Sequence, residues 1–270
     1  SSLARTGLMN HLEAGFLSGR GSDWIFCDLH PGNNPVDNLF RGIADAVVGE
    51  VEEDTGGGTG ERSAQIRDFL EGHVIAQRRT SDLNTVLDLV AGIGTRPIMI
   101  LVDQFEELFR YAQSDSEAAV NLVDILLKTA AASGKIYIVI TIRTDELEKC
   151  SRYPGLVRLI NDSQFLTPVL DRYQIQQAIE GPITLWGGQI LPDLSTWLLN
   201  CLEDELDKLP LMQHALRVLY AAKTSAEGHK DVIIGLADFV QVFGLPEKLD
   251  LMSAEGRLAL RRTLSDRLTR

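Results

Sequence analysis

Cysteine is scarce in this chain of 270 residues. The three cysteines, Cys27, Cys150 and Cys201, lie far apart in the sequence and form no CxxC pair. An odd number of separated cysteines argues against a disulfide framework or a zinc cluster. It favours a reducing compartment, and we therefore expect a cytoplasmic protein.

Long hydrophobic runs and an excess of basic residues are also missing. The longest strand-like apolar runs, PIMILV and IYIVITI, are far too short to cross a bilayer, so no membrane contact is expected. Lys and Arg number 26 against 38 Asp and Glu, which gives a net charge of −12. This balance argues against a broad surface for nucleic acid and leaves room only for a local basic patch, so no direct nucleic-acid partner is expected.

One stretch, Pro97 to Arg110, combines a buried strand with a cluster of acids. It reads PIMILVDQFEELFR, in which six apolar residues are followed by Asp103, Glu106 and Glu107. The apolar run is typical of a strand covered on both faces of a parallel sheet. Open α/β sheets bind ligands at the carboxyl ends of such strands, and hard oxygen ligands there suit magnesium. The stretch has the form of a Walker B segment. The alternative is that Asp103 only caps a helix with a solvated acidic face.

Short apolar strands alternate with amphipathic helices as far as residue 168. The pattern predicts helices over 2–14, 35–51, 62–77, 81–92 and 115–132, and strands over 24–27, 97–102, 135–142 and 165–167. This order predicts βαβ units and a parallel sheet. Beyond residue 170 the pattern is helical over 194–202, 209–220 and 249–268, with 231–235 as a candidate isolated strand. The glycine run in 52–61 lacks a following Lys-Ser or Lys-Thr, so we interpret it as a linker.

A basic residue, Arg143, follows the strand after the acidic stretch. Parallel strands bring their carboxyl ends to one edge, so Arg143 and Asp103 are expected to face one ligand. Phosphoryl transfer needs a carboxylate that binds metal, a carboxylate that orients water and a cation that contacts phosphate. A surface salt bridge from Arg143 to Asp145 or Glu146 is the alternative.

The motifs LVDQFEELF, IVITIRTDEL and KLPLMQHALRVLY, in this order, resemble the STAND class of P-loop signal-transduction NTPases. The resemblance covers nearly the whole chain and is nearest to the bacterial branch whose Walker B reads DQFEE. It implies an α/β fold, with a P-loop NTPase parallel sheet and flanking helices. It also implies three domains: a core over 1–170 that lacks its first strand and P-loop, an α-helical lid over 171–230, and the start of a winged-helix or further helical region over 231–270. The chain begins where the glycine-rich loop and its lysine should just have ended, so we expect them upstream in a longer parent protein.

The resemblance also implies roles for residues near the phosphates. The hydroxyl of Ser1 would ligate Mg²⁺, and Ser2 would approach the α-phosphate. Asp103 would hold Mg²⁺ directly or indirectly. Glu106 or Glu107 would polarise the attacking water, and Glu107 is favoured because the related pattern with an Asp-Glu pair places Glu there.

Other implied contacts come from later in the chain. Arg143 matches a sensor position that contacts the γ-phosphate. Pro210 matches a lid proline that packs near the nucleotide base, and His214 lies one helical turn later; the alternative for Pro210 is a proline that simply opens a helix. His30 stands where the family usually has Arg. Gln104 stands where many related ATPases carry their catalytic Glu.

The implied function is an ATP/ADP-binding molecular switch within a larger bacterial signalling or antiviral defence protein. Its expected partners are ATP or ADP with Mg²⁺, other copies of itself on activation, and the effector and sensor domains of the parent chain. The alternative is a catalytically silent scaffold that links effector and sensor. A DNA-binding regulator is disfavoured by the net charge.

Overall fold

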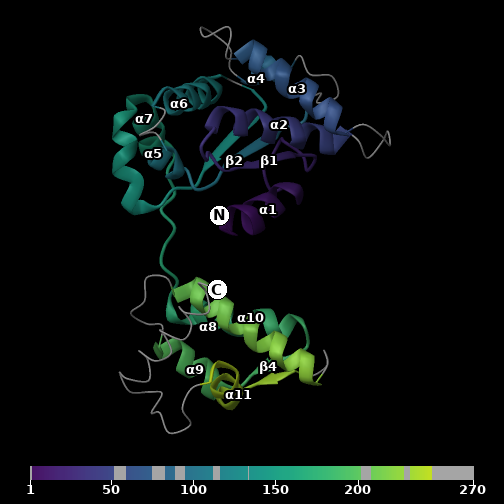
Figure 1. Cartoon of the computed structure of the whole chain (residues 1–270), viewed down its shortest axis with the longest axis vertical. Coiled ribbons are helices and arrows are strands. Elements are labelled where there is room, and N and C mark those ends of the chain that lie inside the picture. The colour runs from purple at the N-terminus through teal and green to yellow at the C-terminus, as the bar shows by residue number, and fades with distance from the viewer. Residues whose placement is uncertain are drawn as a thin grey trace. The chain divides into compact units, whose positions relative to one another are not determined.

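The chain forms two compact units, Ser1–Phe165 and Leu166–Arg270, each with its own hydrophobic core. The computed structural model, drawn in Figure 1, describes residues 2–51, 59–74, 83–88, 95–111, 116–132, 134–201, 208–227 and 232–244. Ser1, most of the glycine run and the expected helix over 249–268 lie outside these residues. No helix within the described ranges is long and apolar enough to cross a membrane.

The first unit is an α/β layer structure. Its elements are η1 (Leu3–Met9, a π-helix), α1 (Asn10–Glu13), β1 (Ile25–Leu29), α2 (Pro35–Val51), α3 (Thr59–Val74), α4 (Leu83–Leu87), β2 (Ile98–Val102), α5 (Glu107–Tyr111), α6 (Ser116–Ala131), β3 (Ile136–Ile140), η3 (Thr144–Arg152, a 3₁₀-helix) and α7 (Pro154–Ser163). The three strands pair in parallel in the order β1-β2-β3. The parallel sheet with flanking helices, expected from the alternating pattern, is therefore confirmed.

The central strand β2 is buried along its whole length because both faces of the sheet are covered. Ile98, Ile100 and Val102 pack into the large core with α2 and α6. Met99 and Leu101 point the other way, against Ala4 and Leu12 of the N-terminal helix. This two-sided cover explains why the strand is apolar at every position instead of alternating.

The strand β3 is less buried than its sequence predicts. We expected a second buried strand over 135–142, but all five residues of β3 are only partly buried. The reason is its position, because β3 lies at the end of the strand order and, among the described residues, pairs only with β2.

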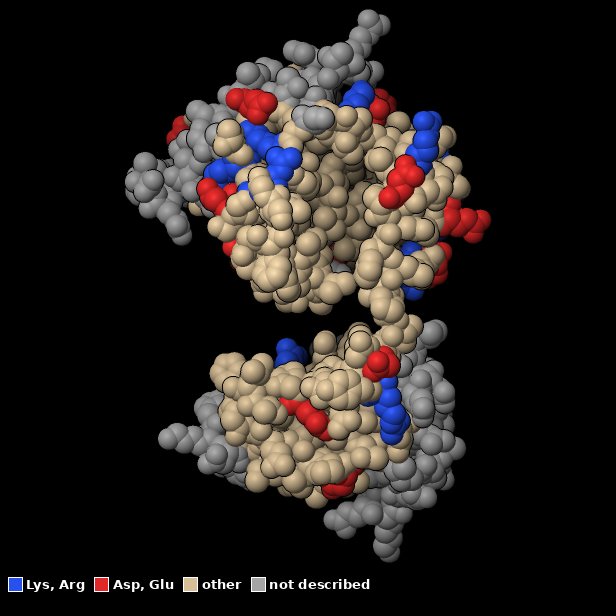
Figure 2. Space-filling model, turned by 180° about the vertical axis from the view of Figure 1, so that it is seen from behind, with Lys and Arg blue, Asp and Glu red and all other residues tan. Residues whose placement is uncertain are grey.

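Charged residues at the amino ends of the strands are held in ion pairs. Arg96 lies 2.7 Å from Asp23, and Lys135 lies 2.9 Å from Asp88. On the face drawn in Figure 2, basic side chains of the first unit lie close to acidic ones around an uncharged middle. At the carboxyl ends of the strands, one arginine contacts two carboxylates, and these residues form the candidate site.

The segment that joins the two units is not a strand. Residues 164–171 have no regular structure, so the expected strand over 165–167 is wrong. Phe165 and Leu166 are 77% and 71% exposed. No described strand pairs with this segment, so its apolar residues have no sheet to be buried in.

The second unit is mainly helical. Its elements are α8 (Arg172–Leu185), β4 (Gln189–Ile190), α9 (Pro192–Cys201), α10 (Lys208–Glu227), β5 (Ile233–Ile234) and α11 (Leu236–Phe243). The helix α8 begins with a capping box, in which the Asp171 carboxylate accepts from the Gln174 N–H at 2.8 Å. The candidate strand over 231–235 corresponds to β5 and is not isolated, because β5 pairs in parallel with β4, a two-residue strand that the sequence did not reveal.

The division of the chain differs in detail from the expected domains. The structure divides it at Phe165–Leu166, whereas the sequence placed the boundary at residue 170. The helix α11, expected in a third domain over 231–270, shares one core with α8, α9 and α10 through Phe239 and Phe243. The separate third domain stays a prediction.

Candidate functional site

Asp103 is the buried centre of the carboxyl edge of the sheet. It follows β2 directly and is 1% exposed. Its N–H donates to the Leu29 carbonyl at 2.9 Å, which ties it to the end of β1. Its Oδ1 accepts from the Gln104 N–H at 3.1 Å and from the Thr141 hydroxyl. The carboxylate is therefore fixed in orientation by its own turn and by the neighbouring strand.

Thr141 reaches Asp103 because of the register of the sheet. Val102 pairs with Ile140, so Asp103 and Thr141 are the next residues in line on adjacent parallel strands. The Thr141 carbonyl also accepts from the Phe105 N–H at 2.9 Å. Gln104, between them, has a φ of 54°, which turns the chain sharply and directs its N–H at both Asp103 and Thr141.

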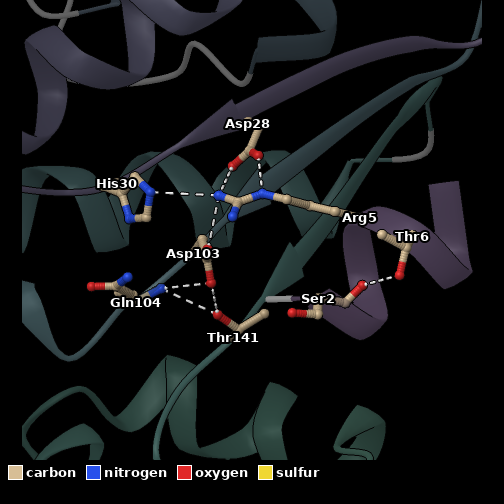
Figure 3. Close-up of polar contacts among 8 residues, drawn as sticks. All are labelled: Ser2, Arg5, Thr6, Asp28, His30, Asp103, Gln104 and Thr141. Atoms are coloured by element: carbon tan, nitrogen blue, oxygen red, sulfur yellow. Dashed lines mark hydrogen bonds and ion pairs between the residues drawn. The ribbon is translucent and has the colours of Figure 1, made fainter. Parts of the chain in front are cut away.

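A guanidinium lies against the other oxygen of Asp103. Figure 3 shows Arg5 extending from the N-terminal helix between Asp28, His30 and Asp103. Its Nη2 lies 2.9 Å from Asp103 Oδ2, 3.1 Å from Asp28 Oδ1 and 3.5 Å from His30 Nε2, and its Nε bonds Asp28 Oδ2. The hydrogen bond to Asp28, together with the charges of Asp28 and Asp103, raises the pKa of Arg5.

The alternation of β1 explains how Arg5 meets Asp28. Cys27 and Leu29 face the large core, so Asp28 between them faces the opposite side of the sheet. The N-terminal helix covers that side through Ala4 and Leu12. Arg5, next to Ala4, therefore lies within reach of the carboxyl ends of β1 and β2.

The two glutamates after Asp103 have different surroundings. Glu106 is 6% exposed. Glu107 opens α5, and its Oε2 accepts from the Gly32 N–H at 3.1 Å. Gly32 has a φ of 55° and lies in the loop after β1. Glu107 therefore tethers this loop to the segment that carries Asp103.

Arg143 is engaged at the surface. Its Nε and Nη2 donate to the two carboxylate oxygens of Asp145 at 3.0 and 2.8 Å. Both side chains are well exposed, and this hydrogen bonding to Arg143 lowers the pKa of Asp145. The surface salt bridge that the sequence left open is thus present, while contact of Arg143 with a phosphate stays a prediction. The residue after β3 that touches Asp103 is Thr141.

The remaining predicted residues are distributed over both units. Ser2 lies at the start of the helix that carries Arg5, where its carbonyl accepts from the Thr6 hydroxyl at 2.8 Å (Figure 3). Ser1 lies outside the described residues. Pro210 is exposed in the first turn of α10 and His214 is partly buried one turn later, both in the second unit. Their proximity to a nucleotide therefore stays a prediction.

The donor set at the sheet edge fits a divalent cation in its chemistry. The carboxylates of Asp28 and Asp103 contact the positive guanidinium of Arg5, and the hydroxyl of Thr141 donates to the other oxygen of Asp103. Among the described residues, no group of three or more His, Cys, Asp or Glu has the arrangement of a metal site. Mg²⁺ commonly uses only one or two protein carboxylates and takes its other ligands from water and phosphate, so the set is adequate.

A parallel sheet with helices on both faces and a buried aspartate at the carboxyl end of its central strand is consistent with the fold of P-loop NTPases. The family model described as Novel STAND NTPase 1 matches residues 1–249, and the chain belongs to this family. Membership implies that the chain is a nucleotide-binding module. Among curated proteins none matches the chain.

Sequence reasoning missed Arg5, Asp28 and Thr141 as parts of the site. Thr141 could have been found by aligning the ends of the two apolar runs, since Val102 and Ile140 are the last strand residues. Asp28 interrupts the apolar strand IFCDL and thereby signalled a polar position. Nothing in the helical pattern distinguished Arg5, because its contacts depend on the side of the sheet that the helix covers.

Proposed function

We propose that this chain is the ATP- and ADP-binding switch module of a larger bacterial signalling or antiviral defence protein. In this proposal, ATP binding and slow hydrolysis control its opening and oligomerisation. The observation that carries it is the buried Asp103 at the carboxyl end of the central strand, in a chain of the STAND NTPase family. Ligands of open parallel sheets bind at this edge.

The phosphate side of the site would be formed by residues at the start of the chain and after β2. Asp103, held in orientation by Thr141, would bind Mg²⁺ with the hydroxyl of Ser1. Ser2 would approach the α-phosphate. A bound divalent cation would supply positive charge to the phosphates.

Hydrolysis would require a group that orients water and a group that contacts the γ-phosphate. Glu107 is the proposed water-polarising residue, with Glu106 as the second candidate. Arg143 would contact the γ-phosphate after exchanging its partner Asp145 for phosphate. An exposed ion pair such as Arg143–Asp145 is weak, so this exchange is energetically accessible.

The second unit would provide the lid. Pro210 and His214 on α10 would pack near the nucleotide base, and ADP would hold the two units closed. Exchange for ATP would release the lid and expose a surface for other copies of the protein. The effector and sensor domains would belong to the same parent chain.

The central test measures nucleotide and turnover in the full-length protein. Nucleotide released by denaturation would be identified by chromatography, and phosphate release would give the turnover. We expect Asp103→Asn to lower turnover or metal affinity by about 10- to 100-fold, the usual effect of disturbing a metal site. Asp124→Asn, which removes an exposed carboxylate of α6 paired with Lys128, is the matched control and should leave both unchanged. Unaltered hydrolysis in Asp103→Asn would refute the site.

A second set of variants separates the two glutamates. Glu107→Gln keeps an acceptor for the Gly32 N–H but removes the negative charge, whereas Glu107→Ala removes both. If Glu107 polarises water, both variants lose turnover and retain ATP. If it only tethers the loop, Glu107→Gln stays active. Glu106→Gln tests the other candidate in the same assay.

The silent scaffold is the second candidate function. It is favoured by the pairing of both guanidinium groups, Arg5 with Asp28 and Asp103 and Arg143 with Asp145. It predicts no nucleotide in the gently purified full-length protein and no phosphate release. Copurified ADP, or a change of mass on adding ATP, would exclude it.

A further inference from the structure

Arg5 bridges two carboxylates that belong to adjacent strands. Its guanidinium contacts Asp28 in β1 through Nε and Nη2, and Asp103 after β2 through Nη2 at 2.9 Å. Arg5 comes from the N-terminal helix on the covered side of the sheet. One cation from a third element is thus shared between two negative charges at the carboxyl edge.

The partners differ in their access to water. The side chain of Arg5 is 39% exposed and that of Asp28 is 33% exposed, whereas that of Asp103 is 1% exposed. Arg5 can exchange its carboxylate partners for water at modest cost because it lies near the surface. Asp103 cannot, since a buried carboxylate left without a cation is strongly unfavourable. Removal of Arg5 from Asp103 therefore favours entry of another cation.

The two carboxylates that contact the guanidinium are suited to a small hard cation. The oxygens of Asp28 and Asp103, and the hydroxyl of Thr141 that donates to Asp103 Oδ1, are ligands of the kind that Mg²⁺ and Mn²⁺ accept. Arg5 itself lies in the π-helical segment η1. Such segments are rare and are frequently found at functional sites. The positive charge beside Asp103 thus comes from Arg5 on a separate and unusual helical element.

We propose that the guanidinium of Arg5 and a divalent cation compete for Asp103, so that binding of the cation releases the Arg5 side chain from the sheet edge. This inference rests on the proposed cation site at Asp103 and adds its regulation. Arg5 fills the place of the cation and keeps the buried charge neutral until the cation arrives. Release of Arg5 would remove the charged contact of the N-terminal helix with β1 and β2, while the apolar contacts of Ala4 and Leu12 with the sheet would remain.

The direct test is a titration of the purified chain with Mn²⁺, in which electron paramagnetic resonance measures the free ion. No nucleotide is needed. We expect Arg5→Ala to bind Mn²⁺ at least about tenfold more tightly than the wild type, because the competing charge is gone. Arg5→Ala combined with Asp103→Asn should lose this gain. Arg41→Ala removes an arginine that pairs with Asp37 on α2, and it controls for the change in net charge.

Thermal unfolding provides a second readout. Arg5→Ala should unfold at a lower temperature than the wild type in EDTA and recover on adding Mg²⁺, whereas the double variant should not respond. A purely structural ion pair would also lower the unfolding temperature in Arg5→Ala, but without tighter Mn²⁺ binding. Equal Mn²⁺ affinity in wild type and Arg5→Ala, or no binding in either, would overturn the inference.

A measurement on the wild-type chain covers the case in which Arg5→Ala does not fold. The Nε–H resonance of Arg5, assigned by its loss in Arg5→Lys, should shift toward the position of a solvated arginine as Mg²⁺ is added. An unchanged resonance at saturating Mg²⁺ would also overturn the inference. Nucleotide binding by the full-length protein is a separate measurement, so the proposed function can fail or hold independently.

Discussion

At the scale of single residues, Gln104 combines an unusual backbone angle with a role at the site. Its φ of 54° lies in the left-handed region, which is unfavourable for residues other than glycine. Its N–H donates to Asp103 Oδ1 and Thr141 Oγ1, both at 3.1 Å. The turn is therefore maintained by hydrogen bonds that also orient the buried carboxylate.

This geometry predicts opposite outcomes for two substitutions. Gln104→Gly should leave the free energy of unfolding within about 1 kcal/mol of the wild type, because relief of strain offsets the added chain entropy. Gln104→Val should lose about 1–3 kcal/mol, because a β-branched residue is strained at positive φ. Urea unfolding measures both. Equal stability of the two variants would contradict the role of the backbone angle.

Cys27 should be chemically inert in the folded protein. Burial, together with the charges of Asp28 and Asp45, raises its pKa to about 12. Because the pKa of Cys27 is higher in the folded than in the unfolded protein, the neutral thiol contributes to stability below the unfolded pKa. This contribution is lost as the pH rises toward the folded pKa. Wild type should therefore lose more stability than Cys27→Ala between about pH 7 and about pH 10, a range that spans the unfolded pKa. Identical losses in urea unfolding would show that Cys27 does not contribute.

The site shows which residues a sequence can reveal. Asp103, Glu106 and Glu107 were predictable because they follow an apolar strand in one short motif. Thr141 depends on strand register, and Arg5 depends on the side of the sheet that its helix covers. Contacts between distant segments of this kind have no local pattern in the sequence. The salt bridge of Arg143 with Asp145 was foreseen as an alternative because the two residues are near neighbours.

At the scale of elements, the start of α11 depends on an ionised side chain. Asp238 Oδ2 accepts from the Gly235 N–H at 2.8 Å, and its Oδ1 lies 2.9 Å from Lys223 Nζ of α10. Burial acts to raise the pKa of Asp238, but the Gly235 N–H and Lys223 outweigh it, so the pKa is lowered. The carboxylate thus joins two helices of the second unit.

A lowered pKa determines the sign of the pH dependence. The stabilisation by Asp238 is present above its unfolded pKa of about 3.9 and is lost as the pH falls through the lower folded value. Asp238→Asn should lose about 1 kcal/mol at neutral pH, as for other helix caps, and should weaken the acid dependence. Asp162→Asn, an exposed position in α7, is the control. Parallel acid unfolding curves for wild type and Asp238→Asn would contradict this prediction.

The side chain of Asn84 joins α4 to β3 and α6 by hydrogen bonds, and Gly134 leaves the space that this side chain occupies. The Asn84 side chain accepts from the Ile136 N–H at 3.1 Å and donates to the Thr129 carbonyl at 3.3 Å. A Cβ on Gly134 would lie 1.9 Å from Asn84 Oδ1. The space is therefore too small for any side chain at this position.

We expect Gly134→Ala to destabilise the first unit by about 1–3 kcal/mol through overpacking. Gly49→Ala on α2 is the matched control, because an added Cβ there meets no atom within 4 Å. That control should be neutral or stabilising by up to about 1 kcal/mol, since alanine favours helices. Chemical unfolding followed by circular dichroism compares them. A neutral Gly134→Ala would show that Asn84 can move.

Elements were predictable where they are long or strongly apolar. The helix over 35–51 and the strand over 97–102 have clear periodicity and correspond to α2 and β2. The two-residue strands β4 and β5 are too short for any period to be visible. The error at 165–167 arose because an apolar run was interpreted as a strand without a partner to pair with.

At the scale of the whole molecule, the two separate cores predict two unfolding events. Phe165, Leu166 and Tyr173 are 77%, 71% and 69% exposed around the junction of the units. Chymotrypsin should therefore cut within the irregular segment 164–171, while Phe109, at 6% exposure, is protected. Calorimetry should show two transitions. A single transition with equal calorimetric and van't Hoff enthalpies would mean that the units unfold together.

The edge position of β3 has a consequence for behaviour at high concentration. Among the described residues its only strand neighbour is β2, and its side chains, which include Ile138 and Ile140, are partly exposed. Where no further strand of the parent protein pairs with it, an edge of this kind is a template on which a strand of another molecule can grow, and amyloid-like pairing begins in the same way. The exposed edge of β3 therefore makes aggregation of this chain dependent on its concentration during storage.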